Sequence, residues 1–358
     1  MEFHQILVSA SPGDAITNAA LELRALLGQV TRSHIFARYI DPALGGEVFP
    51  LGSYPARLGV ATGKNVLLYH ASIGEPHVAS FLLGRPERIV LVYHNISPAD
   101  SFRPYDPVFA GLLEEGRREL AGLADRVALA LAVSAYNAEE LRALGYRDVR
   151  VAPLIVDASR LRSVDSDAGM AGELERRKGP LILFVGQLLP HKRPDLLLQA
   201  YHVLITYLVP DAHLVLAGAS RLEPYRGALE WFIRELNLFN ATLMGSVSLG
   251  ALVALYRRAD VFVTLSEHEG FCVPLLEAMT FDVPVIARAH AAVGETLGDG
   301  GLLLPPDDDP LLAAEAMAAV TMDRELGDRL ISRGRRRLAH FDPDAARATL
   351  LQHLLSLV

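Results

Sequence analysis

The chain has 358 residues, a length typical of two domains, and 51% of them are hydrophobic while 21% are charged. This balance excludes a disordered chain, and a net charge of −8 excludes a chain-wide basic surface for nucleic acid or anionic lipid. A single cysteine excludes an internal disulfide and a thiolate metal cluster. The sequence shows neither a secretory signal nor an apolar run long enough to cross a bilayer, so we expect a cytoplasmic protein.

Short apolar runs recur along the chain and alternate with stretches of helical spacing. Such runs are typical of strands buried on both faces of a sheet. They occur at residues 6–8, 66–69, 89–93, 128–133, 181–185, 214–217, 261–265 and 283–287. The helical stretches lie at residues 16–27, 107–123, 137–144, 194–208, 249–258 and 274–279. This alternation predicts an α/β protein with two doubly wound, Rossmann-like domains, which we expect to face a central cleft.

A polar segment without any strand-like run, residues 163–179, marks the boundary. We therefore expect an N-terminal domain over residues 1–162, a linker over 163–179 and a C-terminal domain over 180–341. An amphipathic helix over residues 342–358 begins at an Asp-Pro pair, and we expect it to pack back on the N-terminal domain.

The loop after the strand at 261–265 carries the most informative residues. Glu269 lies in this loop, and Glu277 lies in the helix that begins near Pro274. Free backbone N–H groups at a helix start favour an anion such as a diphosphate, and Gly270 allows a close backbone approach. Carboxylates accept hydrogen bonds from sugar or ribose hydroxyls. Spacing alone leaves open that both glutamates only complement the helix dipole.

The pattern from Glu269 to Glu277, with Gly270, Phe271 and Pro274 between them, resembles the nucleotide-sugar motif of family 4 glycosyltransferases, which have the GT-B fold. Further segments resemble motifs of this family in the same order along the chain: FVGQLLPHKRPDLLLQAY, LVLAGAS and LMGSVSLGALVALYRRADVFV in the C-terminal half, and VYHNISP, AVSAYNAEELRALGY and VRVAPLIVD in the N-terminal half.

The resemblance implies a retaining glycosyltransferase that moves a hexosyl group from a nucleoside-diphosphate sugar to a hydroxyl of a glycan or lipid-linked acceptor. No separate cofactor is implied beyond the donor. Similarity to mannosyltransferases of surface polysaccharide assembly favours GDP-mannose as the donor, and a UDP-sugar is the alternative. A glycosyl phosphorylase on the same architecture also stays open.

The resemblance also assigns roles around the diphosphate. Glu277 is expected to bind the ribose and Glu269 the donor-sugar hydroxyls. The backbone near the sugar and phosphates is expected to come from Gly270, Phe271 and Cys272.

Lys192 is expected to neutralise the leaving diphosphate, as a compact ammonium group does well. Gly186 is followed by Gln187 where the family usually has Arg, so Arg193 is the candidate to supply the missing charge. This departure leaves open a catalytically weak protein that only binds nucleotide sugars.

Two histidines and a glycine are candidates in the N-terminal half. His94 ends the strand at 89–93, and the resemblance implies that it reaches the donor sugar across the cleft. His70 ends another strand and is a candidate for the acceptor side. Gly13 lies in a loop that resembles the family's first loop near the diphosphate. Together with Lys192 and Glu269, His94 completes the predicted catalytic set.

Other sites have little support in the sequence. No GxGxxG motif follows a strand, and no HExxH motif occurs, so we expect neither dinucleotide binding nor a protein-held metal. A basic run at Arg333, Arg335, Arg336 and Arg337 is typical of a solvated helix face. Its alternative is a peripheral contact with the inner face of a membrane.

Overall fold

The computed structural model describes residues 1–54 and 64–357, and the chain forms two α/β units. The first unit comprises Met1–Arg103, Pro107–Ile155 and Pro343–Val358, and the second comprises Pro104–Asp106 and Val156–Asp342. The boundary lies after Ile155, whereas the sequence placed it after residue 162. The segment 163–179, predicted to be a linker, belongs to the second unit, where α8 (Ala168–Glu175) packs against α11 (Leu249–Arg258).

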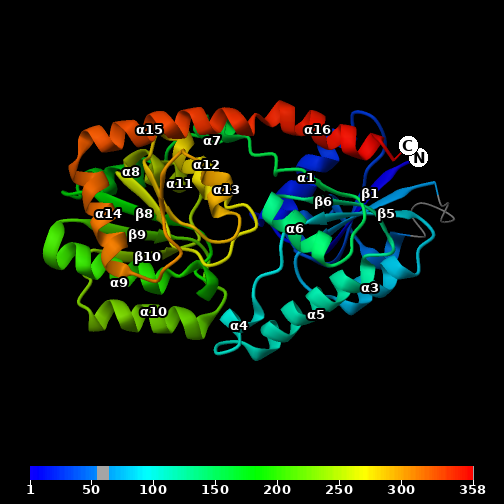
Figure 1. Cartoon of the computed structure of the whole chain (residues 1–358), viewed down its shortest axis with the longest axis horizontal. Helices are drawn as coiled ribbons and strands as arrows, with labels where there is room; N and C mark the ends of the chain where they lie inside the picture. The colour runs from blue at the N-terminus through cyan, green and yellow to red at the C-terminus, as the bar shows by residue number, and fades with distance from the viewer. Residues whose placement is uncertain (55–63, 358) are drawn as a thin grey trace. The chain divides into compact units, whose positions relative to one another are not determined.

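The first unit, which holds both ends of the chain (Figure 1), contains a parallel seven-stranded sheet in the order β3-β2-β1-β4-β5-β6-β7. Its central strand β4 is buried along its whole length, which shows that both faces of the sheet are covered. The strands are β1 (Phe3–Ala10), β2 (Ile35–Ile40), β3 (Val48–Pro50), β4 (Val66–Ala71), β5 (Arg88–Tyr93), β6 (Val127–Ala132) and β7 (Val149–Val151).

The helices of the first unit begin at residues suited to a helix N-terminus. Asp14 caps the first helix by accepting a 2.9 Å hydrogen bond from the backbone N–H of Thr17, and Ser134 caps another. The helices are α1 (Ala15–Leu27), α3 (Pro76–Leu83), α4 (Ala99–Phe102), α5 (Pro107–Leu123), α6 (Ala135–Ala143) and α16 (Pro343–Leu355).

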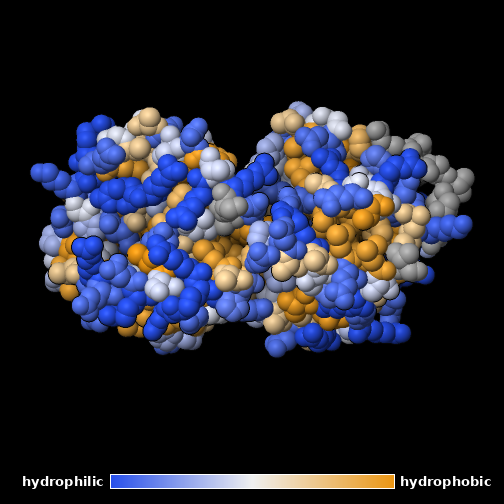
Figure 2. All heavy atoms as spheres, turned by 90° about the horizontal axis from the view of Figure 1, so that it is seen from above, coloured by the Kyte–Doolittle hydropathy of each residue, from blue (hydrophilic) through white to orange (hydrophobic). Residues whose placement is uncertain are grey.

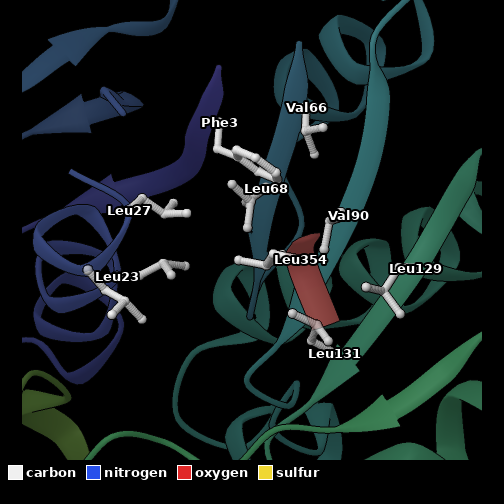
Figure 3. Close-up of a cluster of buried hydrophobic side chains, with 10 residues drawn as sticks. Phe3, Leu23, Leu27, Val66, Leu68, Val90, Leu129, Leu131 and Leu354 are labelled. Carbon is white, nitrogen blue, oxygen red and sulfur yellow. The ribbon is translucent and has the colours of Figure 1, made fainter. Parts of the chain in front are cut away.

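Helix α16 completes the hydrophobic core of the first unit. Leu354 is fully buried and packs with side chains of α1 and four strands: Phe3, Leu23, Leu26, Leu27, Val66, Leu68, Val90, Leu129 and Leu131 (Figure 3). Arg347 adds a 2.8 Å ion pair with Glu22 of α1. The C-terminal helix thus belongs to the unit that the beginning of the chain builds.

The second unit repeats this architecture with a parallel six-stranded sheet in the order β10-β9-β8-β11-β12-β13. In each sheet the chain starts in the middle, runs to one edge and then returns to the other side, so the prediction of two doubly wound sheets is confirmed. The strands are β8 (Leu181–Val185), β9 (His213–Ala217), β10 (Ala241–Gly245), β11 (Val261–Thr264), β12 (Val285–Arg288) and β13 (Leu302–Leu304). Ligands bind such sheets at the carboxyl ends of the strands where the order reverses, here at β8 and β11.

The predicted helix at 194–208 changes its winding after Val203. Leu204–Leu208 forms a π-helical turn in which the backbone N–H of Val209 donates to the carbonyl of Leu204 at 2.7 Å. Pro210 cannot continue a helix, which explains why the winding loosens there. The remaining helices are α7 (Ala158–Arg162), α9 (Pro194–Val203), α10 (Glu223–Glu235), α12 (Val273–Thr280), α13 (Val293–Leu297), α14 (Pro310–Met322) and α15 (Arg324–Leu338).

The basic run lies near the end of α15, on a face of the second unit that is largely hydrophilic (Figure 2). Arg333 and Arg336 are exposed, whereas Arg335 pairs with Asp282 at 2.7 Å. Arg337 turns inward and donates to the carbonyl of Thr296 at 3.0 Å. Among the described residues, no helix has both the length and the apolar character that a membrane span requires.

Candidate active site

Two neighbouring strands of the second sheet bring Lys192 and Glu269 together. Lys192 ends a short 3-10 turn (Pro190–Lys192) after β8, and Glu269 lies in the loop after β11. The Nζ atom of Lys192 donates to Oε2 of Glu269 at 2.6 Å. The lysine side chain is 21% exposed and the glutamate side chain only 9%. The pair therefore has one well-buried member and one that solvent still reaches.

The carboxylate of Glu269 is held in one orientation by its surroundings. Its second oxygen, Oε1, accepts a 2.9 Å hydrogen bond from the hydroxyl of Ser266, which is itself bonded to Thr264 at 3.0 Å. The backbone carbonyl of Glu269 accepts from the N–H of Ala292 at 3.2 Å. Both the backbone and the side chain of this loop residue are thus fixed.

The loop that contains Glu269 continues into α12 through Gly270, Phe271 and Cys272. Cys272 has a positive φ of 70°, and no side chain of the described residues caps the helix. Within the first turn of α12, Pro274 has no N–H group and the N–H of Leu275 donates to the carbonyl of Cys272 at 3.2 Å, so an anion would meet mainly the backbone of the preceding turn. The thiol of Cys272 lies against the Glu269 carboxylate, and burial raises its pKa well above the usual value. It stays a thiol and is unsuited to act as a nucleophile.

Glu277 lies in α12 and contacts a neighbouring helix. Its Oε2 accepts a 2.8 Å hydrogen bond from the hydroxyl of Tyr256 in α11. Burial raises the pKa of the Glu277 carboxyl and also that of the Tyr256 hydroxyl. The tyrosine therefore acts as the donor, and it fixes where the carboxylate points.

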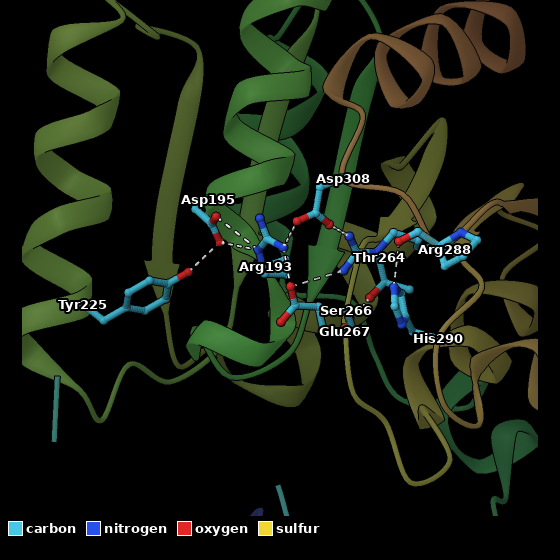
Figure 4. A network of polar contacts seen from close by, with 10 residues as sticks. Arg193, Asp195, Tyr225, Thr264, Ser266, Glu267, Arg288, His290 and Asp308 are labelled. Carbon is cyan, nitrogen blue, oxygen red and sulfur yellow. Dashed lines mark hydrogen bonds and ion pairs between the residues drawn. The ribbon is translucent and has the colours of Figure 1, made fainter. Parts of the chain in front are cut away.

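Arg193 follows Lys192 but has different partners (Figure 4). Its guanidinium forms ion pairs with Asp195 at 3.2 Å, with Asp308 at 2.6 Å and with Glu267. Burial by itself lowers the pKa of Arg193, but hydrogen bonds and charges from these three carboxylates raise it above the usual value. Arg288, which is 1% exposed, also pairs with Asp308, and burial lowers its pKa. Two cations thus face three carboxylates at this edge of the sheet.

This network fixes loops from four strands to one another. Arg193 follows β8, Glu267 follows β11, Arg288 ends β12 and Asp308 follows β13. The sequence suggested that Arg193 assists at the diphosphate. In the structure its charge is already neutralised within the protein.

Gly186 and Gln187 lie directly after β8. A Cβ atom on the adjacent Gly218 would lie 1.9 Å from the carbonyl oxygen of Gly186, so only glycine fits at residue 218. The backbone carbonyl of Gln187 accepts from the N–H of Leu189 at 2.9 Å, and its side chain is half-buried. A glutamine here supplies no charge, as its chemistry dictates.

The first sheet brings His94, His70 and Gln5 together. The Nε2 atom of His94 lies 2.8 Å from Nδ1 of His70, and Nε2 of His70 lies 2.8 Å from Oε1 of Gln5. Burial lowers the pKa of His94 to about 4 and that of His70 well below its usual value. Both rings are therefore neutral near pH 7.

The two histidines line a cavity of about 40 Å³, enough for one small polar group such as a hydroxyl. Its other walls are mostly apolar and come from Ala19, Glu22, Leu23, Val92, Leu131, Val133, Ala152, Pro153, Leu154, Ile155 and Leu350.

Gly13 lies in the loop after β1 with a positive φ of 76°. No described atom lies within 4 Å of where its Cβ would be, so backbone conformation, not space, favours glycine there.

Comparison with known proteins shows which family this region of the chain resembles. Residues 166–337 match the family described as "Glycosyl transferases group 1". This region includes the Lys192–Glu269 pair, the start of α12 and the whole of the second sheet. Over these residues the chain is similar to the group 1 glycosyltransferases.

Two curated relatives show similar levels of identity to this chain. O-antigen chain mannosyltransferase B from Escherichia coli is 29% identical over 256 residues, which are 68% of this chain and 64% of the relative. D-inositol 3-phosphate glycosyltransferase from Nocardia farcinica is 30% identical over 235 residues, which are 63% of this chain and 51% of the relative. The chain therefore matches between half and two thirds of the length of these relatives.

Solved structures share the fold over nearly all of the chain. Sucrose-phosphate synthase from Thermosynechococcus elongatus aligns with a TM-score of 0.76 and 19% identity, covering 100% of this chain and 99% of that one. HepE from Anabaena in complex with UDP-glucose aligns with a TM-score of 0.77 and 15% identity, covering 99% and 100%. The GT-B fold predicted from the sequence motifs is thus confirmed.

Several residues of these clusters were not predicted from the sequence: Gln5, Tyr256, Ser266, Glu267, Arg288 and Asp308. Two of them carry a detectable signal, because Gln5 and Arg288 are polar residues within apolar strands and both are buried. A polar residue in such a strand needs a partner, and that need marks it as a candidate.

Proposed function

We propose that this chain is a retaining glycosyltransferase that moves a hexosyl group from a nucleoside-diphosphate sugar to a hydroxyl of a glycan or lipid-linked acceptor. The observation that carries the proposal is the 2.6 Å pair of Lys192 and Glu269 beside the uncapped start of α12. This arrangement combines a cation and a carboxylate at the sheet edge where ligands bind, next to the backbone turn that leads into α12. The match of residues 166–337 to the group 1 family supports a nucleotide-sugar donor.

Lys192 and Glu269 have separate roles in this proposal. The partly exposed ammonium of Lys192 transfers its hydrogen bond to the donor diphosphate and stabilises the charge that builds on the leaving oxygen. The carboxylate of Glu269 then accepts hydrogen bonds from donor-sugar hydroxyls. Ser266 continues to hold Glu269 in place while its other partner is exchanged.

The nucleotide is held by the start and the body of α12. The backbone of Gly270, Phe271 and Cys272, at the positive end of the helix, binds the phosphates. Glu277, oriented by the hydroxyl of Tyr256, accepts from the ribose. Arg193 contributes indirectly, because its three carboxylate partners fix the loops that carry Lys192 and Glu269.

Substitution occurs on one face of the sugar. The bond from the anomeric carbon to the diphosphate breaks as the acceptor oxygen attacks from the same side. The acceptor proton passes to the departing phosphate oxygen, so no covalent enzyme intermediate forms. The protein stabilises the leaving group and positions the substrates.

GDP-mannose is the donor that we propose, supported by the similarity to an O-antigen chain mannosyltransferase. Thermal unfolding with GDP, UDP, GDP-mannose and UDP-glucose tests this choice, because a ligand that binds only the native state raises the melting temperature. A larger shift with UDP-glucose than with GDP-mannose rejects the proposed base and sugar.

Gln187 stands where the family usually has Arg and supplies no charge. This favours, as a second candidate function, the binding of a nucleotide sugar without transfer. Release of nucleotide from the best-binding donor, measured with and without glycan acceptors, separates the two. Binding without release across all acceptors favours a binding protein.

A further inference from the structure

Three side chains on one face of the first sheet form a continuous hydrogen-bonded chain. Gln5 of β1, His70 of β4 and His94 after β5 come from strands that are neighbours in the sheet. The amide Nε2 of Gln5 donates to the backbone carbonyl of Ala20 in α1 at 2.9 Å. The chain therefore runs from a backbone carbonyl, through Gln5 and His70, to His94.

The backbone carbonyl sets the direction of every bond in this chain. A carbonyl oxygen only accepts, so the Gln5 amide must turn its NH₂ group toward Ala20 and its oxygen toward His70. The Nε2 atom of His70 must then carry the proton that this oxygen accepts. In the neutral ring the Nδ1 atom of His70 is an acceptor, so Nε2 of His94 must donate to it.

The hydrogen-bonded chain ends at a nitrogen lone pair of His94. A neutral His94 that is protonated at Nε2 has an unprotonated Nδ1, and no described residue donates a hydrogen bond to that atom. Burial lowers the pKa of His70 and of His94, which keeps both rings neutral and the bond directions intact near pH 7.

We infer that Gln5 and His70 are positioning residues that hold His94 in its Nε2–H tautomer, so that Nδ1 accepts a hydrogen bond from a hydroxyl of a sugar substrate. This inference rests on the proposed function for the identity of the substrate. It also defines what His94 selects, because a neutral acceptor binds an O–H donor and has no hydrogen to offer to a phosphate oxygen. His94 is thus a hydroxyl-specific contact, in contrast to the cationic contact that Lys192 provides.

Two-bond proton–nitrogen correlation spectra of the full chain test the tautomer directly at pH 7, without substrate. We expect the His94 ring to show an unprotonated Nδ1 and a protonated Nε2, with the assignment made by comparison with a His94→Gln variant. A His94 ring protonated at Nδ1, or at both nitrogens, overturns the inference. This readout does not depend on transfer, so the inference can fail or survive separately from the proposed function.

Three substitutions test how the tautomer is held. Gln5→Leu and His70→Phe each remove one link, and we expect both to give mixed tautomers at His94 and to lower kcat/KM about five- to tenfold, the effect of one hydrogen bond. His70→Asn places an amide oxygen near the former Nδ1 and is expected to restore the Nε2–H signal and most of the rate.

His4→Phe is the matched control, because His4 is a buried histidine of the same sheet, in β1, that takes no part in the hydrogen-bonded chain. An equal kinetic loss in His4→Phe and His70→Phe, with His94 unchanged in both spectra, overturns the positioning role. Should either variant unfold, the wild-type spectrum still decides the tautomer.

Discussion

The two sheets place their polar residues at the same topological position, but these residues are charged in one sheet and neutral in the other. In the second unit, the strands β8 and β11 bring together Lys192 and Glu269, next to two arginines and three carboxylates. In the first unit, the corresponding central strands β1 and β4 bring together an amide and neutral imidazoles. Within the charged edge the lysine cation suits a diphosphate, and the neutral edge suits hydroxyl groups. The difference teaches that the fold provides the position and the side chains decide which part of a substrate binds there.

Removing either member of the central pair is the strongest test of the charged edge. We expect Lys192→Ala and Glu269→Ala each to lower the transfer rate about 10²–10³-fold, since each removes charge or positioning at the reacting centre. Initial rates with the donor that gives the largest melting shift provide the measurement. Glu173→Ala, which breaks the pair between this residue of α8 and Arg177, is the control and should transfer normally. Near-normal transfer in both active-site variants places the donor elsewhere.

A substitution of Arg288 tests how much the ion-pair network around Arg193 contributes to stability. Arg288→Met removes a buried cation from Asp308, and we expect the free energy of unfolding to fall by about 2 kcal/mol, less than for a fully buried pair because Asp308 is half exposed. Urea unfolding measures the loss. Arg324→Met, at an exposed pair with Asp328 3.9 Å away, should change stability by less than about 0.5 kcal/mol. If the two variants lose the same stability, the network does not hold the loops.

The neutral edge predicts a specific dependence of stability on pH. His94 binds a proton at about pH 6.5 in the unfolded chain but only at about 4 in the native state, so between these values the unfolded state holds more protons. Stability from this residue is complete above pH 6.5 and is lost as the pH falls toward 4.

We therefore expect His94→Gln to reduce the loss of stability between pH 7 and pH 5 by up to about 2 kcal/mol, as 1.5 pH units at 1.36 kcal/mol each imply. Chemical denaturation at the two pH values measures it. His340→Gln, a change on the surface, serves as the control. If His94→Gln and the wild type lose the same stability between pH 7 and pH 5, the prediction that His94 is neutral in the native state is wrong.

The smallest expected effect concerns Glu277. Tyr256→Phe removes the hydroxyl that orients this carboxylate, and we expect binding of the nucleoside diphosphate to weaken about fivefold, the equivalent of one hydrogen bond. Calorimetric titration measures the affinity. Tyr201→Phe also removes a buried tyrosine hydroxyl, bonded to the carbonyl of Ala212, but lies away from α12 and should leave the affinity unchanged.

The sequence predicted the centre of the fold better than its edges. All eight predicted strands are present, because strands buried on both faces are continuous apolar runs. Five edge and near-edge strands were missed where burial is partial: β2 is exposed over much of its second half, β10 is half-buried along its whole length, and β3, β7 and β13 have only three residues each. Short or half-exposed strands leave no continuous apolar run to detect.

The residues of the candidate site also fall into those that the sequence predicted and those that it could not. The motif that contains Glu269 predicted a site at the carboxyl end of β11, and Lys192 followed from the motif after β8. The partners of Arg193 could not be predicted, because Asp308 is 115 residues away and the contact depends on how the loops fold. Gln5 and His70 become neighbours only through the register of β1 on β4, which pairs Leu7 with His70.

The position of helix α16 affects the order in which the two units can finish folding during synthesis. Leu354 occupies the core built by β1, β4, β5, β6 and α1, so that core lacks a wall until residues 343–357 have been synthesised. The unit whose strands leave the ribosome first is therefore the one that must wait longest for its final packing. During translation the second unit has all of its own residues available while the first still exposes apolar surface, which makes the early half of the chain the part with the greater need for chaperone protection.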